Sequence, residues 1–357
     1  MCNEKKRALI AMSGGVDSSV AALLTRNAGY ECVGCTMRLY ENETAGVDDS
    51  ACCSLSDVED ARSVAYALGM PYYVFNFSDD FGEKIIDKFI DCYFSGTTPN
   101  PCIDCNRYMK FDKLYERAKL LGCNHIVTGH YARIEEENGR PVLKKALDDT
   151  KDQSYVLYSL TPEQLRHTLF PLGSLTKAET RAIAEQNGFI NSHKPDSQDI
   201  CFVPNGDYAA VIERRSGRVS PPGDFIDENG NVLGRHKGII HYTIGQRKGL
   251  GIASSAPLFV TRIDPVNNTV TLTHGAGLFT DTVTVRDVNL SAVDDIETPI
   301  RAEVKIRYRH PAQPATVTRT GPDELTIKFD SPQRAVTKGQ AAVVYQGDTV
   351  LGGGTIV

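Results

Sequence analysis

Residues 10–19 read Ile-Ala-Met-Ser-Gly-Gly-Val-Asp-Ser-Ser, and this stretch decides the fold. The apolar run from Ala8 to Ala11 predicts a buried strand before it, and the apolar residues from Val20 onward predict a helix after it. A Ser-Gly-Gly turn between a strand and a helix leaves backbone N–H groups exposed at the positive end of the helix dipole, an arrangement that binds anions. We therefore expect a phosphate site here, although an ordinary tight turn is the alternative.

The residues of this stretch indicate which class of phosphate-binding loop it forms. They lack the Gly-Lys-Ser/Thr of a Walker A loop, so a common P-loop is excluded. The stretch resembles instead the pyrophosphate loop of the N-type ATP pyrophosphatases, the PP-loop superfamily, whose members cleave ATP to AMP and pyrophosphate. That resemblance implies that Asp17 lies near a Mg²⁺–pyrophosphate group, and capping the following helix is the alternative role.

The rest of the chain divides into an α/β part and a β part. Strand and helix patterns alternate between residues 7 and 130, which predicts a doubly wound parallel sheet that binds its ligand beyond the carboxyl ends of the strands. From Thr282 onward the pattern is wholly β and predicts a small barrel. We expect a pyrophosphatase domain over residues 1–206, a small central β-rich domain over 207–276, and a C-terminal β-barrel over 277–357.

The composition favours a cytoplasmic protein. The chain has 357 residues, a net charge of −6 and no apolar stretch long enough to span a bilayer, so we expect no membrane partner. Its first residues, MCNEKKRALI, lack the pattern of a signal peptide. A negative net charge does not favour nucleic-acid binding, so contacts with RNA have to come from local basic patches.

Ten cysteines point to metal, redox or nucleophilic chemistry in a reducing compartment. Cys102 and Cys105 form a Cys-x-x-Cys in the stretch 97–106, which its prolines predict to be a rigid loop ahead of a helix starting near Lys110. The position of Cys105 near that helix start predicts a lowered thiol pKa. Dithiol redox chemistry, half a zinc site and cluster ligation all fit this spacing, although a structural zinc site is disfavoured because no second loop carries a Cys-x-x-Cys.

Five further motifs make a family resemblance specific. TPNPCIDCN, TGHYAR, KDQSYVLYSL, KPDSQDICFVP and YTIGQRKGLG are together similar to those of the bacterial tRNA-specific 2-thiouridylases, and the matching motifs run from residue 8 to about 310. Members of this family convert the wobble uridine of certain tRNAs, position 34, to 2-thiouridine, using ATP and a persulfide sulfur. The resemblance implies an enzyme, a tRNA-uridine 2-sulfurtransferase, that binds the anticodon stem-loop of tRNA. It also implies a persulfide donor protein, such as a cysteine desulfurase or a sulfur relay.

The resemblance implies roles for individual residues as well. Cys105 is the catalytic cysteine that takes part in releasing sulfur, Cys201 carries the persulfide, and a disulfide between them remains after the transfer. The residues implied in ATP binding are Ala11, Met12, Ser13, Gly14, Gly15, Val16, Asp17, Ser18, Met37 and Gly129. The residues implied at the target base are Asn100, Pro101 and Cys102, and those implied in tRNA contact are Lys151, Asp152, Gln153, Arg307 and Tyr308. ATP and Mg²⁺ are the implied cofactors, and no protein-bound metal site is implied.

Cys102 departs from the family pattern. Many members have Asp at this position, and that Asp is a proposed general base. A thiol is a poor substitute for it, so either Cys102 or Asp104, two residues away, is left to serve as a base if one is needed.

Three other functions remain open from the residues. Cys102, Cys105 and Cys201 can give three thiolates to a [4Fe–4S] cluster, which would make the chain a cluster-dependent tRNA thiolase. A different adenylating PP-loop synthetase would need no thiols at all. A non-catalytic RNA-binding module would need neither the thiols nor the loop.

The densest positive patch falls in the barrel region. If residues 301–309 form one strand, then Arg301, Lys305, Arg307 and Arg309 share one face and Tyr308 takes the other. A solvated strand face is the ordinary explanation of such a run. A second basic cluster at 235–237 and 247–248 favours phosphate contacts with tRNA.

Overall fold

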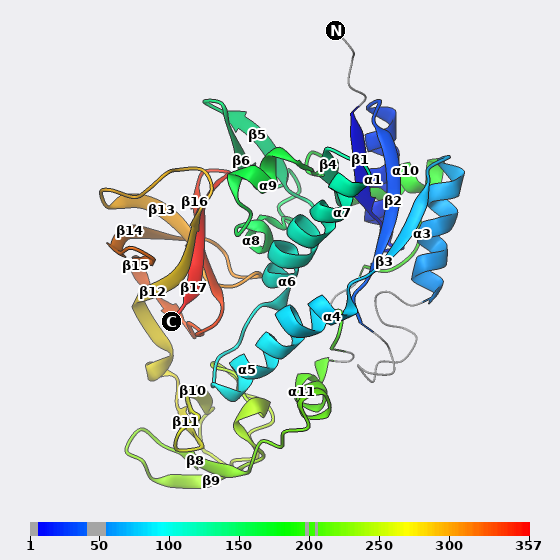
Figure 1. The fold of residues 1–357 in the computed structure, drawn as a ribbon. Helices are drawn as coiled ribbons and strands as arrows, with labels where there is room; N and C mark the ends of the chain where they lie inside the picture. The colour runs from blue at the N-terminus through cyan, green and yellow to red at the C-terminus, as the bar shows by residue number, and fades with distance from the viewer. Residues whose placement is uncertain (1–5, 41–54, 197–199, 204–205) are drawn as a thin grey trace.

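The computed structural model describes residues 6–40, 55–196, 200–203 and 206–357. Its α/β part is built on five parallel strands in the order β3-β2-β1-β4-β7, so the predicted parallel sheet is confirmed. Figure 1 shows the first three of these strands at the right of the molecule. The strands are β1 (Arg7–Ala11), β2 (Glu31–Arg38), β3 (Tyr72–Asn76), β4 (His125–Val127) and β7 (Thr168–Leu169).

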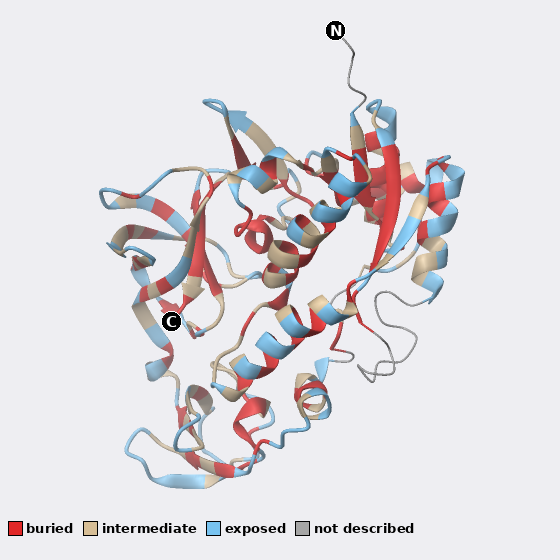
Figure 2. Cartoon of the chain, in the orientation of Figure 1, coloured by how far each residue is buried: buried red, intermediate tan, exposed pale blue. Residues whose placement is uncertain are grey.

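Alternation along β1 divides the core of this part into two layers. Successive side chains of a strand point to opposite faces, so Ala8 and Ile10 pack on one side and Leu9 on the other. The first layer contains α1 (Val16–Asn27), α3 (Leu55–Ala67) and α10 (Lys177–Gln186). Figure 2 shows β1 and β2 almost wholly buried between these layers.

The second layer consists of two continuous helical runs. The first run comprises α4 (Ser78–Phe81), η1 (Gly82–Asp87) and α5 (Lys88–Phe94), and the second comprises α6 (Pro101–Asp104), η2 (Cys105–Lys113) and α7 (Leu114–Leu120). Both η1 and η2 are π-helices, a rare conformation that is frequent at functional sites.

The C-terminal part is a closed antiparallel barrel, as the sequence predicts. Six strands pair in the order β12-β15-β14-β13-β16-β17, and pairing of β12 with β17 closes the ring. A hairpin from the α/β part, β5 (Arg133–Glu137) and β6 (Arg140–Lys144), joins β17 and ties the two parts together. The barrel strands are β12 (Phe279–Leu290), β13 (Ile300–Lys305), β14 (Gln313–Gly321), β15 (Glu324–Arg334), β16 (Ala341–Gln346) and β17 (Thr349–Ile356).

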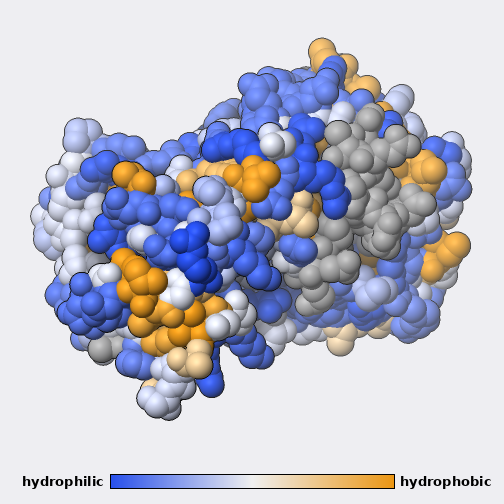
Figure 3. Space-filling model, turned by 90° about the horizontal axis from the view of Figure 1, so that it is seen from below, coloured by the Kyte–Doolittle hydropathy of each residue, from blue (hydrophilic) through white to orange (hydrophobic). Residues whose placement is uncertain are grey.

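Between these parts in the sequence is a small unit with a four-stranded sheet in the order β10-β11-β8-β9, drawn at the bottom of Figure 1. It exposes several apolar side chains, among them Val232, Leu233 and Val266, and the face seen from below is mostly hydrophilic with separate hydrophobic patches (Figure 3). Its elements are α11 (Tyr208–Ser216), β8 (Gly223–Ile226), β9 (Val232–His236), η4 (Ile239–His241), β10 (Phe259–Asp264), β11 (Thr269–Thr273) and η5 (Ala276–Leu278). Two short helices, α8 (Ser154–Leu157) and α9 (Pro162–Arg166), belong to the α/β part. Within the described residues, every helix is too short or too polar to cross a bilayer.

Candidate active site

A cavity of about 930 Å³ lies beyond the carboxyl ends of β1 and β4. These strands are neighbours whose connections run to opposite sides of the sheet, which is where open α/β sheets bind ligands. Four segments supply most of the lining: the loop after β1, the start of the α6–η2 run, residues 194–196 with 200–202, and the end of β13 with the turn 308–311 that follows it.

The loop after β1 forms one end of the cavity, which we call the phosphate end and define by Ser13, Gly15, Asp17 and Ser18. Gly15 is the N-cap of α1 and has no side-chain cap, so the first turn of this helix keeps backbone donors for a ligand. Ser13 N–H donates to Ser18 Oγ (3.2 Å), which folds the loop back over the helix start.

Two glycines are required for this loop to fit its surroundings. Gly14 has φ = 77°, and a Cβ there would lie 2.4 Å from the carbonyl oxygen of Asp57. A Cβ at Gly129, just after β4, would lie 2.8 Å from the backbone nitrogen of Ser18. Gly129 therefore lets β4 approach the loop closely.

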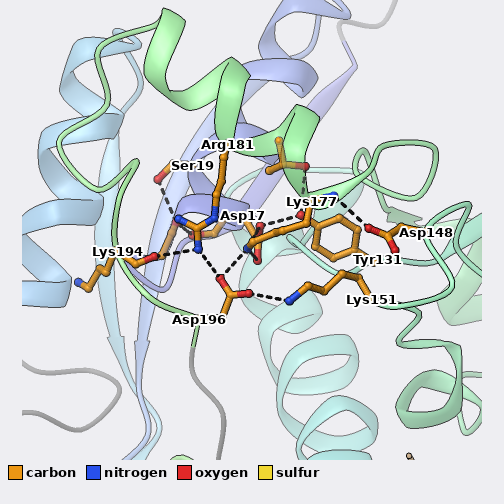
Figure 4. A network of polar contacts seen from close by, with 12 residues as sticks. Asp17, Ser19, Tyr131, Asp148, Lys151, Lys177, Arg181, Lys194 and Asp196 are labelled. Atoms are coloured by element: carbon orange, nitrogen blue, oxygen red, sulfur yellow. Dashed lines mark hydrogen bonds and ion pairs between the residues drawn. The ribbon is translucent and has the colours of Figure 1, made fainter.

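Asp17 is held in a network of charged groups at the phosphate end. Lys177 Nζ, from the start of α10, contacts both carboxylate oxygens of Asp17 at 2.7 and 2.8 Å, and Tyr131 Oη donates to Oδ1 at 2.8 Å. Lys177 also lies 2.7 Å from Asp196, so that one ammonium bridges two carboxylates (Figure 4).

Asp196 ties this network to the segment that carries Cys201. Besides Lys177, it contacts Lys151 Nζ at 2.9 Å and Arg181 Nη2 at 3.1 Å. These cations hold the pKa of the Asp196 carboxyl below its usual value, against the effect of burial. The phosphate end is therefore joined by ion pairs to the loop that leads to the thiol.

The thiols of Cys102, Cys105 and Cys201 line the same cavity, and we call them the thiol wall. The prediction that the Cys-x-x-Cys lies in a loop is wrong. Asn100 Oδ1 accepts a hydrogen bond from Cys102 N–H (3.1 Å) as the cap of α6, and Pro101 occupies the first helical turn. Cys102 is thus exposed at the helix start, and Cys105 lies one turn further along.

The predicted lowering of the pKa of Cys105 is also wrong. The side chain is only 9% exposed, and burial raises the pKa of its thiol to about 11. The charge of Lys110 opposes this rise. Residues five apart lie one turn apart in a π-helix, so the π conformation of η2 brings Lys110 to the cavity beside Cys105.

Cys201 is half-buried, and its carbonyl oxygen accepts a hydrogen bond from Tyr40 Oη at 2.7 Å. Residues 197–199 of the KPDSQDICFVP motif lie outside the described residues. Within the described part of the chain, no three side chains among His, Cys, Asp and Glu come together closely enough to hold a metal ion.

Asp104 is not placed to act as a base in the cavity. It does not line the cavity, and its Oδ1 accepts a hydrogen bond from Lys88 Nζ at 2.8 Å. Of the two candidates from sequence, only Cys102 faces the reaction space.

The Lys-Asp-Gln motif lines the cavity, but each member has an internal partner. Lys151 contacts Asp196, and Asp152 accepts hydrogen bonds from its own loop, including one from Ser154 Oγ at 2.8 Å. Gln153 Oε1 accepts from the backbone N–H of Tyr131 at 2.9 Å. In this structure the motif organises the cavity wall.

The predicted cationic strand over 301–309 is wrong, because β13 ends at Lys305 and the chain then turns. Arg307 does not line the cavity, and its Nη2 donates to the carbonyl oxygens of Arg334 and Ala335. In the same turn, Tyr308 and Arg309 do line the cavity and are exposed.

The structure brings together most of the residues implied from sequence. All of the implied ATP-binding residues except Gly14 line the cavity, as do Pro101, Cys102 and both catalytic cysteines, whereas Asn100 and Arg307 do not. Lys110, Lys177 and Asp196 were missed. Lys177 and Asp196 are too far along the sequence from the loop for a local pattern to reveal them. Lys110 reaches the cavity only because η2 is a π-helix, which no local pattern predicts.

Comparison with known proteins agrees with this architecture. The model of the tRNA methyl transferase HUP domain matches residues 6–205, that of the tRNA methyl transferase PRC-barrel domain matches 211–274, and that of the aminomethyltransferase β-barrel domain matches 280–356. The fold and the loop thus define a nucleotide-binding HUP-domain protein with two further β domains.

Relatives that match over almost their whole length identify the family. The chain is 51% identical over 353 residues to the tRNA-specific 2-thiouridylase MnmA of Clostridioides difficile strain 630, covering 98% of each chain. It is 49% identical to the protein of the same name from Lachnoclostridium phytofermentans and 48% identical to that from Acetivibrio thermocellus, each over 99% of both chains. The chain belongs to the tRNA-specific 2-thiouridylase family.

Proposed function

We propose that the chain uses ATP to replace the C2 oxygen of the wobble uridine of tRNA by sulfur. The observation that carries this proposal is that the phosphate end and the thiol wall belong to the same cavity. A synthetase that forms amides needs no thiols, and a binding module needs neither thiols nor a phosphate site. The cavity supports the thiolase over both.

The phosphate end supports adenylation of the C2 oxygen. That oxygen is a poor leaving group until it is joined to AMP. Backbone donors at the start of α1, with Ser13 and Ser18, hold the phosphates of ATP. A Mg²⁺ ion bound with ATP would neutralise phosphate charge, and the Asp17 carboxylate would be a suitable oxygen ligand for it.

The thiol wall supports the sulfur transfer. The terminal sulfur of a persulfide on Cys201 attacks C2, and AMP leaves with the bonding electrons. The Cys105 thiolate then attacks Sγ of Cys201, which breaks the sulfur–sulfur bond to the base and leaves 2-thiouridine. A Cys105–Cys201 disulfide remains, so the electrons balance.

Lys110 has a positioning role in this scheme. Cys105 is nucleophilic only in its thiolate form, and burial disfavours that form. The ammonium of Lys110 is the nearby positive charge that favours the thiolate, and the π conformation of η2 puts it there.

The tRNA reaches the cavity past the turn after β13. Tyr308 offers a ring for stacking with an unpaired base, and Arg309 offers a charge for a phosphate. In this division residues 1–206 catalyse, 207–276 form the central domain, and 277–357 contribute to tRNA binding. A persulfide-carrying protein is the proposed source of the sulfur on Cys201.

Analysis of the product nucleoside tests this function. Purified protein, unmodified tRNA, ATP and a persulfide donor are incubated, and the tRNA is digested for mass spectrometry. We expect 2-thiouridine, with one AMP formed for each modified base. Unmodified or methylated uridine in the presence of all components would refute the proposal.

A further inference from the structure

Cys102 and Cys105 differ in a way that the sulfur transfer above does not use. Neither residue is in a disulfide and both line the same cavity, but Cys102 is exposed and Cys105 is buried. An exposed thiol one turn before a buried thiol, at the start of a helix, is the arrangement of dithiols that exchange disulfides. The transfer itself requires only Cys105 and Cys201, so Cys102 has no assigned chemistry.

The spacing of the two residues along the helix is compatible with a disulfide. Cys105 N–H donates to the carbonyl oxygens of Pro101 and Cys102, so the four residues form a closed helical turn. From a helical radius of about 2.3 Å and a rise of about 1.5 Å per residue, Cα atoms three apart are separated by about 5 Å. Disulfides span Cα distances of about 4.4–6.8 Å.

The proposed reaction leaves a disulfide that has to be removed. After each transfer Cys105 and Cys201 are joined, and Cys201 cannot accept another persulfide. An external reductant would have to reach Cys105, which is 9% exposed, or the half-buried Cys201. Cys102 is the exposed thiol nearest to Cys105 along the chain, and it lies on the same cavity wall.

We propose that Cys102 is the resolving thiol that resets the enzyme after each sulfur transfer. The inference rests on the proposed function. The Cys102 thiolate attacks Sγ of Cys105, a Cys102–Cys105 bond forms, the Cys105–Cys201 bond breaks, and Cys201 leaves as a thiolate. The exchange consumes no electrons. A dithiol protein reductant then supplies two electrons to the Cys102–Cys105 disulfide, which Cys102 exposes at the surface.

Trapping the disulfide after one turnover tests the proposal. Protein carrying a persulfide on Cys201 is mixed with excess tRNA and ATP without reductant, quenched with acid and an alkylating agent, and mapped by peptide mass spectrometry. Wild type is expected to hold Cys102–Cys105 with Cys201 alkylated, and Cys102→Ser is expected to hold Cys105–Cys201. Cys92→Ser, a half-buried cysteine outside the cavity lining, is the matched control and should give the wild-type map.

Repeated turnover with a dithiol protein reductant gives the kinetic counterpart. Cys102→Ser should form one product per site and then slow by at least tenfold relative to wild type. Cys102→Asp separates the role of a base from that of a resolving thiol. If Cys102 acts as a base, Asp can replace it and turnover is restored; if Cys102 is the resolving thiol, turnover stays slow. A small phosphine, which can enter the cavity, should restore turnover of both variants.

The outcomes distinguish this proposal from the function on which it rests. If wild type forms 2-thiouridine and keeps Cys105–Cys201 as its disulfide, the resolving role is refuted and the function stands. If Cys102→Asp turns over at the wild-type rate, the residue acts as a base and the proposal is again refuted. If wild type forms no thiolated product, the proposed function itself fails.

Discussion

The two ends of the cavity are built on opposite electrostatic principles. At the phosphate end, Asp17 and Asp196 are each paired with cations at 2.7–3.1 Å. At the thiol wall, burial raises the pKa of Cys105 to about 11, so this thiol is neutral near pH 7. The first end is ready to bind charge, whereas the second has to generate charge during the reaction.

This contrast predicts that substitutions at the thiol wall stop sulfur transfer, whereas substitutions at the phosphate end stop adenylation. The largest effect is expected at the thiols. Cys105→Ser and Cys201→Ser should each abolish thiolation, because a hydroxyl cannot replace the sulfur nucleophile. Release of pyrophosphate from ATP in the first adenylation should persist. Residual thiolation above about a tenth of wild type would contradict the two-cysteine scheme.

The next effect is expected at the phosphate end. Asp17→Asn removes the carboxylate that pairs with Lys177, and adenylation should fall by roughly a hundredfold. Affinity for tRNA, measured by filter binding, should be nearly unchanged. Asp60→Asn is the matched control, since Asp60 also pairs with a lysine, Lys194 at 2.7 Å, but does not line the cavity. If Asp17→Asn lost tRNA affinity by as large a factor as it lost adenylation, the two ends would not be independent.

The pH dependence of sulfur release sharpens the contrast. Below a pKa of about 11, the thiolate fraction of Cys105 rises about tenfold per pH unit, so the single-turnover rate of disulfide formation should rise similarly between pH 7 and about pH 9. Lys110→Met should lower the rate throughout this range, because loss of the positive charge raises the thiol pKa further. Lys113→Met, which loses only a pair with Asp80, is the control. A pH-independent rate would contradict a protonated Cys105.

The smallest effect is expected at the turn after β13. Arg309→Ala should weaken tRNA binding a few-fold and reduce its salt dependence by about one phosphate equivalent. Arg307→Ala should instead cost about 2 kcal/mol of unfolding free energy, because two carbonyl oxygens lose a charged donor. If Arg307→Ala weakens tRNA binding more than Arg309→Ala does, the family-implied role of Arg307 holds and our assignment is wrong.

Local patterns predicted the parts of this molecule that depend on local physics. The apolar run of β1, the Ser-Gly-Gly turn and the alternation of barrel strands follow from burial and backbone geometry over a few residues. The helix at Cys102 was predictable too, because Asn100-Pro101 is a cap followed by a first-turn proline, but the prolines around it suggested a loop.

Other features depend on contacts that sequence spacing does not encode. Lys177 is 160 residues from Asp17, and the packing of α10 beside α1 alone brings them together. The burial that raises the pKa of Cys105 comes from tertiary packing as well, and it overrides the effect of the helix start. The end of β13 at Lys305 separates cations that a single long strand would have aligned.

The most direct test of the central claim follows the sulfur atom itself. Protein loaded with a radioactive persulfide on Cys201 is mixed with tRNA and ATP, and radioactivity is measured in protein and in digested nucleosides during one turnover. Our account predicts that the label leaves the protein and appears in 2-thiouridine only when ATP is present, and that Cys105→Ser keeps it attached to the protein. Label that stays on wild-type protein while 2-thiouridine forms would contradict the account.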